Sequence, residues 1–538
     1  MKKYKILLCG DSNLDHFNLP DYEFDAYRFE IEVALYNSWL DVLVNGEKYS
    51  LSQYDAIWFL VSPLTLFSKQ CDIYLSSLSE FLKKNKQCTV LVNALNFHKD
   101  TCFPMGNRAE NFEAVYRANK KLYELDHEHP NVFCINLDYQ ICKLGLDNIY
   151  SQKIYDLSRI FFNFNAVDSI VQYYIKSFLS IFIPSKKVLC VDLDNTLWGG
   201  ILSDLGPQDI CMGQDSQGLP YYRMQLLLKE LLNNGVLLAI TSKNDIGDVY
   251  KVFEHNRDFL LNKEDIAAWG VNWESKSDNI LQISENLNLS LDSFAFFDDS
   301  EFERAEVKGA LPMVGVIEVP KSPYGYASAL SNFFGFDRVS ITSEDGQKNK
   351  QYEILARGKE ARARFNSNEE FLISLNLELL YSKSTENNNR VVQLINKTNQ
   401  FNINRNKLTP AKFDSLMSNS NVQIAHYSLS DIFGSHGTIA SVIYETFDTV
   451  IYVYYFVLSC RALNRSIEEA IVNQLICIGN TESITQIVFS VDFSSGRNKL
   501  AEKFFLQNIF VLKGANYVLF LDKEKTENFE SFVNLIEV

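Results

Sequence analysis

The stretch VLCVDLDNTLWGG, residues 188–200, constrains the fold of this chain more than any other segment. Its first four residues, Val188 to Val191, are apolar, as in a strand that is buried on both faces of a parallel sheet. Asp192 and Asp194 follow, and side chains two positions apart on an extended segment point to the same side. Two acids this close repel each other unless a cation or a shared proton relieves them. The stretch therefore predicts either a metal site at the carboxyl end of a strand or a solvated turn that caps a helix.

Short apolar runs alternate with amphipathic stretches along most of the chain, which is typical of an α/β fold with parallel strands. The chain has 538 residues, too many for one core, and this length predicts roughly three domains. We expect an N-terminal domain in 1–185, a central domain in 186–325, a helical linker in 326–380 and a C-terminal domain in 381–538. Two long strands, TIASVIYE and VIYVYYFVLSC, are expected to be neighbours in the last domain.

The composition excludes several classes of protein. The net charge of −16 disfavours nucleic acid as a partner. No apolar run approaches the roughly 20 residues of a membrane span, so we expect no membrane partner. The ten cysteines are scattered without a CxxC pair, which is typical of free thiols in a reducing cytoplasm and not of a disulfide framework or a zinc site. We therefore expect a cytoplasmic protein.

Three further signals follow the two acids, each at the end of a predicted strand or the start of a predicted helix. The strand VLLAITS ends in Thr241 and Ser242, whose hydroxyl groups can hold a phosphate oxygen or cap a helix. Lys276 stands just before an apolar-periodic helix, either as a site residue or as solvated surface. The Phe-rich strand SFAFF closes with Asp298 and Asp299, and two adjacent acids at a buried strand end are costly without a cation. Metal binding explains that pair better than structure alone.

The order of these signals, DxDxT, a hydroxyl, a lysine and an acidic pair, resembles the haloacid dehalogenase-like (HAD) phosphotransferase superfamily. The blocks DLDNTLWGG, AITSKND and FFDDSEFER look like the FkbH family, a capless branch of that superfamily (subfamily IIIC). Downstream, INKTNQFN and FVLSCRALNRSIEEA resemble the C-terminal part of the same family. The resemblance implies a HAD-like Rossmannoid central domain in an enzyme, a Mg²⁺-dependent HAD-type phosphatase and glyceryl (acyl) transferase.

The resemblance implies a role for each motif residue. Asp192 is the nucleophile that accepts the phosphoryl group, and Asp194 is the general acid. Ser242 orients the phosphate, with Thr241 as the competing residue for that position. Lys276 neutralises the charge of the phosphoaspartate. The Mg²⁺ ligands are Asp192, Asp194 through its backbone carbonyl group, Asp298 and Asp299.

FkbH-like proteins are similar to enzymes that take 1,3-bisphosphoglycerate, remove phosphate and deliver a glyceryl unit to the phosphopantetheine thiol of an acyl carrier protein. The resemblance therefore predicts this small phosphorylated substrate and this carrier as partners. A Mg²⁺-dependent HAD phosphatase of a surface-polysaccharide or other biosynthetic pathway is the alternative, and a noncatalytic scaffold is a second alternative. The short spacing between Ser242 and Lys276 leaves little room for a cap domain, so we expect an open site.

The segment VIYVYYFVLSCRALNRSIEEA predicts a strand, a short polar loop and a helix, whose N-terminus can bind phosphate. It looks like the pantetheine/CoA-binding turn of the GNAT fold, although Asn464 and Ser466 stand where glycines are usual. The cofactor-binding residues that this GNAT-like resemblance implies are Arg461, Asn464 and Arg465. Cys460, just before a helix N-terminus, is either a reactive thiol that holds a glyceryl thioester or a buried structural cysteine. His436, in FGSHGT, is either a base or a turn residue.

At the N-terminus, LLCGDSN resembles the first block of SGNH hydrolases, with Ser12 in the nucleophile position. That family pairs its serine with a late Asp-x-x-His block. Residues 150–186 contain no histidine, and a serine without its base is a weak nucleophile. We therefore expect an SGNH-like domain that has lost hydrolase chemistry.

Overall fold

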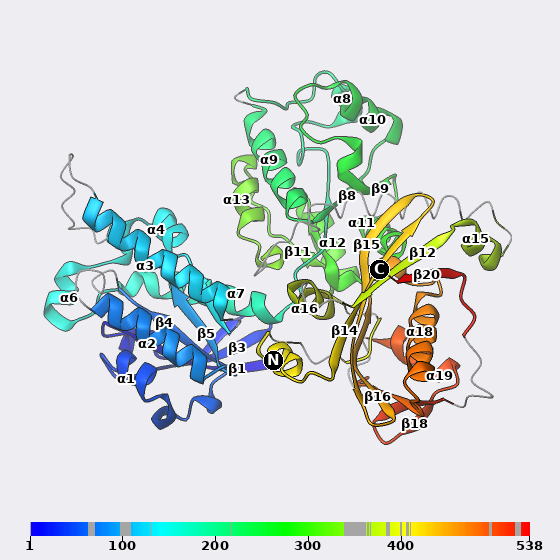
Figure 1. The fold of residues 1–538 in the computed structure, drawn as a ribbon. Helices are drawn as coiled ribbons and strands as arrows, with labels where there is room; N and C mark the ends of the chain where they lie inside the picture. The colour runs from blue at the N-terminus through cyan, green and yellow to red at the C-terminus, as the bar shows by residue number, and fades with distance from the viewer. Residues whose placement is uncertain are drawn as a thin grey trace. The chain divides into compact units, whose positions relative to one another are not determined.

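The structure is a computed structural model that describes residues 2–62, 70–96, 109–129, 131–215, 217–337, 362, 365, 367–383, 388–398, 401–404, 408, 410–493, 498–521 and 529–537. By its internal contacts the chain divides into two compact units, residues 1–182 with 409–415 and residues 183–408 with 416–538. The described residues form three sheets of six, five and nine strands, with helices packed on them (Figure 1). This confirms the predicted α/β fold class, while the domain boundaries stay predictions. None of the described helices is long and apolar enough to cross a membrane.

The first unit is built on a sheet with the strand order β2-β3-β1-β4-β5-β6. Its strands are β1 (Lys2–Gly10), β2 (Leu19–Phe24), β3 (Tyr27–Val33), β4 (Ala56–Leu60), β5 (Thr89–Asn93) and β6 (Val132–Ile135). All neighbours are parallel except β2 and β3, which form an antiparallel pair at the edge. The sequence analysis missed β2 and β3, because their charged residues hide the apolar alternation that marks a strand.

Helices cover both faces of this sheet. They are α2 (Gln70–Lys84) and α3 (Ala109–Glu128) on one face and α7 (Val167–Phe182) on the other. Tyr74 and Leu122 pack with Phe59 in the first layer. On the opposite face, the rings of Trp58 and Tyr174 lie 5.3 Å apart between their centroids. Alternating strand residues thus supply both cores, as expected of a sheet that is buried on both sides.

The central sheet is parallel and has the order β11-β10-β7-β8-β9. Its strands are β7 (Val188–Val191), β8 (Leu237–Ser242), β9 (Ile266–Val271), β10 (Phe294–Phe297) and β11 (Gly315–Val316). One face packs on α9 (Leu219–Asn233), α10 (Ile246–His255) and α13 (Tyr326–Ser331), and the other on α11 (Lys276–Leu287) and α12 (Glu301–Ala310). The strand order reverses beside β7, because the chain continues to β8 on one side and later returns to β10 on the other. Ligands bind at such switch points in open α/β sheets.

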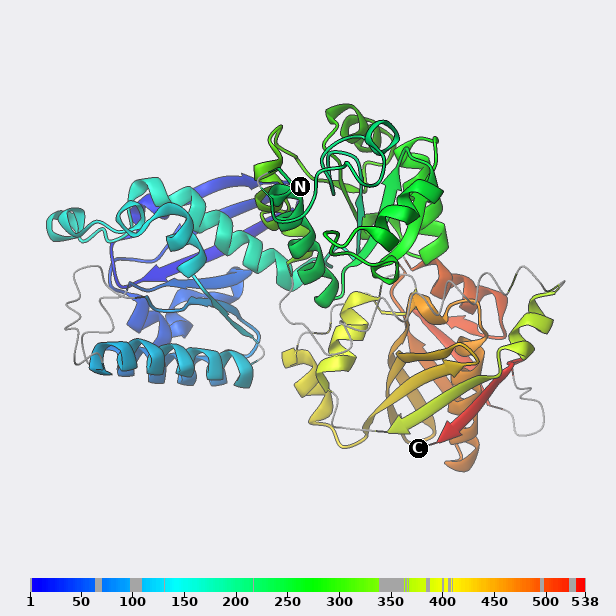
Figure 2. The same cartoon turned by 90° about the horizontal axis from the view of Figure 1, so that it is seen from above.

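The third sheet is mixed and lies in the C-terminal part of the chain. Its long strands β14 (Val422–Asp431), β15 (Gly434–Phe447) and β16 (Val450–Leu458) are antiparallel, which confirms the expected neighbours. The others are β12 (Leu377–Lys383), β13 (Phe401–Asn402), β17 (Gln486–Ser490), β18 (Val511–Lys513), β19 (Asn516–Phe520) and β20 (Val533–Glu537). β12 lies beside β20 at one edge (Figure 2) and begins within the expected helical linker, so that part of the linker prediction is wrong. Its sequence, LELLYSK, alternates buried and exposed residues as a strand does.

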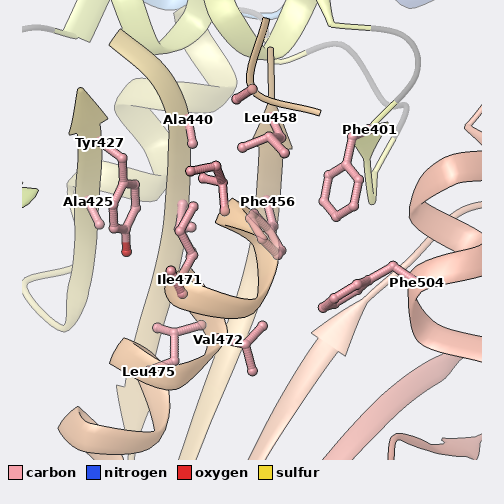
Figure 3. Packing of buried hydrophobic residues seen from close by; sticks show 14 of the residues in the cluster. Phe401, Ala425, Tyr427, Ala440, Phe456, Leu458, Ile471, Val472, Leu475 and Phe504 are labelled. Carbon is pink, nitrogen blue, oxygen red and sulfur yellow. The ribbon is translucent and has the colours of Figure 1, made fainter. Parts of the chain in front are cut away.

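Four of the described helices accompany this sheet: α15 (Asn368–Ser374), α16 (Asn388–Lys397), α18 (Ile467–Thr481) and α19 (Lys499–Gln507). Most of α17 (Pro410–Met417) belongs to the segment 409–415, which is grouped with the first unit. α18 lays its apolar residues, Ile471, Val472 and Leu475 among them, against the long strands (Figure 3). Tyr427 of β14 is fully buried there, and its hydroxyl group donates to Gln474 Oε1 of α18 at 2.5 Å. The helix is therefore fixed to the sheet by apolar packing and by one buried polar contact.

Replacing Leu475 by alanine is expected to destabilise the C-terminal sheet by about 3 kcal/mol, because the side chain is fully buried and leaves a cavity. Leu506→Ala is the matched control, since Leu506 is 67% exposed on α19. Its effect is expected to stay within about 0.5 kcal/mol. Urea unfolding followed by far-UV circular dichroism measures both, and equal losses would contradict the packing described.

Candidate active site

Three carboxylates meet at the carboxyl ends of β7 and β10. Asp192 follows β7 directly, and Asp298 and Asp299 follow β10. Each offers an oxygen that lies within 4.8 Å of those of the other two. The backbone N–H group of Asp192 donates to the carbonyl oxygen of Phe297 at 3.1 Å, which holds the two strand ends together. Sequence positions more than 100 residues apart thus form one group that can hold a divalent cation.

Lys276, the first residue of α11, inserts its ammonium group among these acids. Its Nζ atom donates to Asp192 Oδ1 and, at 2.5 Å, to the carbonyl oxygen of Thr241 at the end of β8. Asp298 Oδ2 lies 3.3 Å from the same nitrogen. Burial lowers the pKa of Lys276, but the charges of Asp192 and Asp298 outweigh it and raise the pKa. The structure therefore places a charged, 3% exposed lysine inside the site, not on solvated surface.

The three carboxylates carry more negative charge than the single ammonium group of Lys276 offsets. This excess of negative charge fits a cation site. Asp298 Oδ2 is buried and makes no hydrogen bond to any described residue, because its ion pair with Lys276 lacks hydrogen-bond geometry. Burial and the charge of Asp192 raise the pKa of Asp298 to about 7. The same two causes raise the pKa of Asp299. A divalent cation among the three oxygens would relieve this repulsion and give Asp298 Oδ2 a second positive partner.

Two residues that the sequence analysis did not assign hold the acidic pair. Thr196 Oγ1 donates to Asp299 Oδ1 at 3.1 Å and accepts from the backbone N–H group of Asp299 at 3.3 Å. The buried Arg304 donates from Nη1 to the carbonyl oxygens of Asp298 and Asp299, at 2.8 and 2.9 Å. Both residues stand inside the quoted motifs, as the threonine of DxDxT and the arginine of FFDDSEFER. The motifs therefore contained the signal, but only the contacts show what these residues do.

Asp194 is held apart from the three-carboxylate group by its own donors. Oδ1 accepts from Trp198 Nε1 at 2.9 Å and from the backbone N–H group of Leu202 at 3.0 Å, and Oδ2 accepts from Asn244 Nδ2 at 3.0 Å. Burial raises the pKa of Asp194, and the hydrogen bonds oppose that rise. Trp198 reaches back because the intervening loop turns at Asn195, whose φ of 54° is left-handed. Asn244 was another missed residue, although it stands in AITSKND.

The two candidate hydroxyl groups at the end of β8 lie in different surroundings. Ser242 Oγ accepts from Asn244 Nδ2 at 3.1 Å, so it shares a donor with Asp194. Thr241 Oγ1 is buried and has no hydrogen-bond partner among the described residues. The carbonyl oxygen of Thr241 accepts from Lys276, so both residues border the site. That Ser242, and not Thr241, orients the phosphate stays a prediction. The donor that Ser242 shares with Asp194, Asn244 Nδ2, supports this choice.

The segment between β8 and α11, residues 243–275, is described throughout and contains α10, one 3-10 turn and β9. All of these belong to the central sheet and its helices. No separate cap domain stands in this segment, as its short length predicts.

The turn after β16 contains the residues assigned to pantetheine binding. Arg461 Nη1 donates to the carbonyl oxygen of His436, and Arg465 Nη1 donates to Asp431 Oδ2, both at 2.9 Å. Both arginines are buried, and these contacts hold them within the C-terminal part of the chain. Asn464 and Ser466 have φ values of 62° and 55°, the left-handed conformation that glycine adopts most easily. Their cofactor-binding role stays a prediction.

Two other expectations for this turn have different outcomes. The side chain of Cys460 lies outside the described residues, so its role as a thiol nucleophile stays a prediction. His436 is fully buried, and its Nε2 atom lies 2.7 Å from Asp431 Oδ2. It therefore stands in β15, not in a turn, and belongs to a buried polar network with Asp431 and Arg465, while its role as a base stays a prediction.

Ser12 of the first unit is 2% exposed, and its hydroxyl group has no hydrogen-bond partner among the described residues. Residues 150–186 contain no histidine, but His16, which is distant in sequence, contacts this segment. Its Nε2 atom donates to the carbonyl oxygen of Phe162 at 2.9 Å. The SGNH-like resemblance and the loss of hydrolase chemistry stay predictions.

Comparisons with known proteins add one informative match. No family model and no curated protein matches the chain. The solved structure of the N-terminal part of the protein BF1531 from Bacteroides fragilis, which contains a phosphatase domain complexed with Mg, is 27% identical. The match covers 63% of this chain and 96% of that chain with a TM-score of 0.56. A GNAT-family acetyltransferase from Staphylococcus aureus Mu50 matches 27% of this chain at 11% identity with a TM-score of 0.22, covering 99% of that chain.

Three findings indicate the same class of domain: the topology of the central sheet, the acids at its switch point and the match to a phosphatase domain. Together they define a HAD-like phosphatase domain in this chain. The match extends beyond this domain, because 63% of the chain is more than the central sheet and its helices contain.

Mg²⁺ is expected to bind at the three carboxylates with an affinity that rises as the pH passes through about 7, because the raised pKa of Asp298 leaves that carboxyl group partly protonated below this value. Asp299→Asn is expected to weaken binding by at least about tenfold. Isothermal titration calorimetry at several pH values measures both effects. Asp204→Asn, on the exposed turn α8 (Leu202–Leu205), is the control and should bind as the natural chain does. Equal affinities for the two variants would place the cation elsewhere.

Proposed function

We propose that this chain is an FkbH-like enzyme that removes phosphate in a Mg²⁺-dependent reaction and transfers a glyceryl unit from 1,3-bisphosphoglycerate to an acyl carrier protein. The phosphatase part rests on one observation, the buried Lys276 between Asp192 and Asp298 at the switch point. The transfer part rests on the resemblance of the turn around Cys460. Its left-handed Asn464 and Ser466 support this part of the proposal, because they reproduce the backbone conformation of a glycine-containing turn.

Phosphate removal follows from the positions of these side chains. Bound Mg²⁺, held by Asp192, Asp298, Asp299 and the carbonyl group of Asp194, would neutralise negative charge on the phosphoryl group and orient it. The free oxygen of Asp192 attacks phosphorus, while Lys276 on its other oxygen offsets the charge of the phosphoaspartate. The hydroxyl group of Ser242 donates to a phosphoryl oxygen.

In this proposal Asp194 carries out the proton transfer. In the proposed reaction it gives a proton to the leaving oxygen, and it then takes one from the water that hydrolyses the phosphoaspartate. Burial raises the pKa of Asp194, which makes the protonated form available closer to neutral pH. Trp198 and Asn244 fix the direction of its two oxygens.

The transfer step needs a thiolate and an acyl phosphate. In this proposal the Cys460 thiolate attacks the carbonyl carbon of the acyl phosphate, a thioester forms and phosphate leaves. The phosphopantetheine thiol of the carrier then attacks the thioester, and Cys460 leaves as a thiolate. Arg461, Asn464 and Arg465 would contact the arm at this turn.

A second candidate is a Mg²⁺-dependent HAD phosphatase of a surface-polysaccharide or other biosynthetic pathway. The internal contacts of Arg461 and Arg465 favour it, because guanidinium groups already bound to His436 and Asp431 are less available to a carrier arm. A noncatalytic scaffold fits the site less well, since three clustered carboxylates with one ammonium group are costly without a function.

Asp192→Asn is expected to lower phosphate release by roughly 10³-fold, because the amide keeps the size of the side chain but removes the nucleophile and a charged metal ligand. The measurement is phosphate release from a small phosphate ester in the presence of Mg²⁺, with circular dichroism as a check of folding. Ser12→Ala is the control and should keep the activity of the natural chain. A folded Asp192→Asn variant with near-normal turnover would refute the assignment.

Cys460→Ser is expected to abolish the glyceryl adduct that intact-mass analysis should detect after incubation with 1,3-bisphosphoglycerate and Mg²⁺. Phosphate release from a small phosphate monoester should persist, because that reaction uses the Asp192 site. Cys477→Ser, at an exposed cysteine of α18, is the matched control and should keep the adduct. Phosphate release without any adduct on the natural chain would favour the second candidate.

A further inference from the structure

Two large aromatic side chains of the phosphatase domain face water. Trp273 and Phe302 are each 74% exposed. The other four tryptophans of the chain are buried or half-buried. A single exposed apolar residue needs no explanation, but several at one edge of a site mark a binding surface.

Both residues lie at the edge of the sheet where the acids meet. Trp273 stands three residues before Lys276, and Phe302 stands three residues after Asp299 in the first turn of α12. The two helices are neighbours there, because Glu306 of α12 accepts from the backbone N–H group of Ser277 at 3.3 Å and from its hydroxyl group. Trp273 and Phe302 therefore stand next in the chain to the segments that supply Lys276 and the acidic pair.

The loop that carries Trp273 is held by specific contacts. The side chains of Asn272 and Asn279 exchange two hydrogen bonds of 2.8 and 2.9 Å, and Asn272 Oδ1 also accepts from the N–H group of Glu274. The N–H group of Asn272 donates to the carbonyl oxygen of Ser242 at 3.1 Å. Gly270 leaves room for this arrangement, since a Cβ atom there would lie 3.0 Å from Cβ of Asn279. The indole is thus exposed on an ordered loop that is tied directly to the site.

The surroundings of the two rings indicate what they bind. Ile201 and Leu205, which lie in the segment between β7 and α9, are each 45% exposed. Glu274 and Glu301, next in sequence to the two aromatic residues, are exposed acids. Negative charge beside the rings disfavours the acidic surface of a partner protein but not an uncharged apolar group. The occupant that fits is the apolar part of a substrate whose phosphate lies at Asp192.

We propose that Trp273 and Phe302 bind an apolar extension of the phosphate ester, so that the site prefers esters with such an extension to small polar ones. This inference rests on the phosphatase activity proposed above.

The test compares phenyl phosphate with methyl phosphate in the presence of Mg²⁺. Trp273→Ala should lower kcat/KM for phenyl phosphate by about tenfold, and for methyl phosphate by less than about twofold, because only the phenyl ester reaches the rings. Phe302→Ala should shift the same ratio in the same direction, and Trp273→Phe should retain most of the preference. Met313→Ala is the control. Met313 is 55% exposed and stands just before the amino end of β11, away from the carboxyl ends of the strands, so the change should leave kcat/KM for both esters unaltered.

Calorimetric binding of phenylphosphonate and methylphosphonate separates this inference from the proposed function. The natural chain should bind phenylphosphonate more tightly, and Trp273→Ala should reduce its affinity to that of methylphosphonate. This result without turnover of either ester would support the surface and contradict the phosphatase proposal. Equal losses for both ligands would show that Trp273 only maintains the loop, and no change for either would show that the rings do not bind the substrate. Either outcome would overturn the inference.

Discussion

The ion pair of Lys276 with Asp192 and Asp298 is the interaction on which the rest of the central domain depends. Three carboxylates at adjoining strand ends would repel each other in a dry site, and a single buried ammonium group offsets part of that charge. The same nitrogen donates to the carbonyl oxygen of Thr241, so one side chain links the ends of β7, β8 and β10. The start of α11 is therefore set by electrostatics as well as by its apolar face.

Around this ion pair, each reactive group has a separate positioning contact. Thr196 and Arg304 hold the acidic pair, while Trp198 and Asn244 direct Asp194 away from it. This separation lets neighbouring acids perform different tasks, because one carboxylate faces the cation and the other is surrounded by donors. Trp273 and Phe302 stand exposed in the neighbouring segments, and in the proposed ester preference they extend the site from phosphate chemistry toward recognition of the rest of the substrate.

The C-terminal part shows how buried charge can serve structure. Asp431, His436 and Arg465 form a network at the end of the β14–β15 hairpin, and Arg461 binds the backbone of the same hairpin. These contacts secure the turn that follows β16, in which two residues adopt left-handed conformations. The same contacts occupy both arginines of the turn.

The sequence by itself determined the fold class and the phosphatase motifs of the central domain. Apolar strands that end in acids or hydroxyl groups, such as the segments before Asp192 and Asp298, are local patterns. They predict that the strand is buried and that its carboxyl end lies where the polar residues begin. The sequence did not predict strands whose apolar alternation is weak or whose pattern also fits a helix or a loop. β2 and β3 are rich in charge, and β12 was hidden in an expected helical linker, because short alternating segments acquire their strand partners only through tertiary pairing.

Only the tertiary structure decided how the motif residues divide their tasks. Nothing in the order of the residues shows that Lys276 contacts Asp192 and Asp298 while Asp194 bonds to Trp198 and Asn244, because these contacts arise where separate strands and helices end side by side. The exposure of Trp273 is equally invisible in the sequence, since tryptophan side chains are highly buried on average. Strand ends are local and can be predicted from composition, whereas distances between them depend on the packing of the whole sheet.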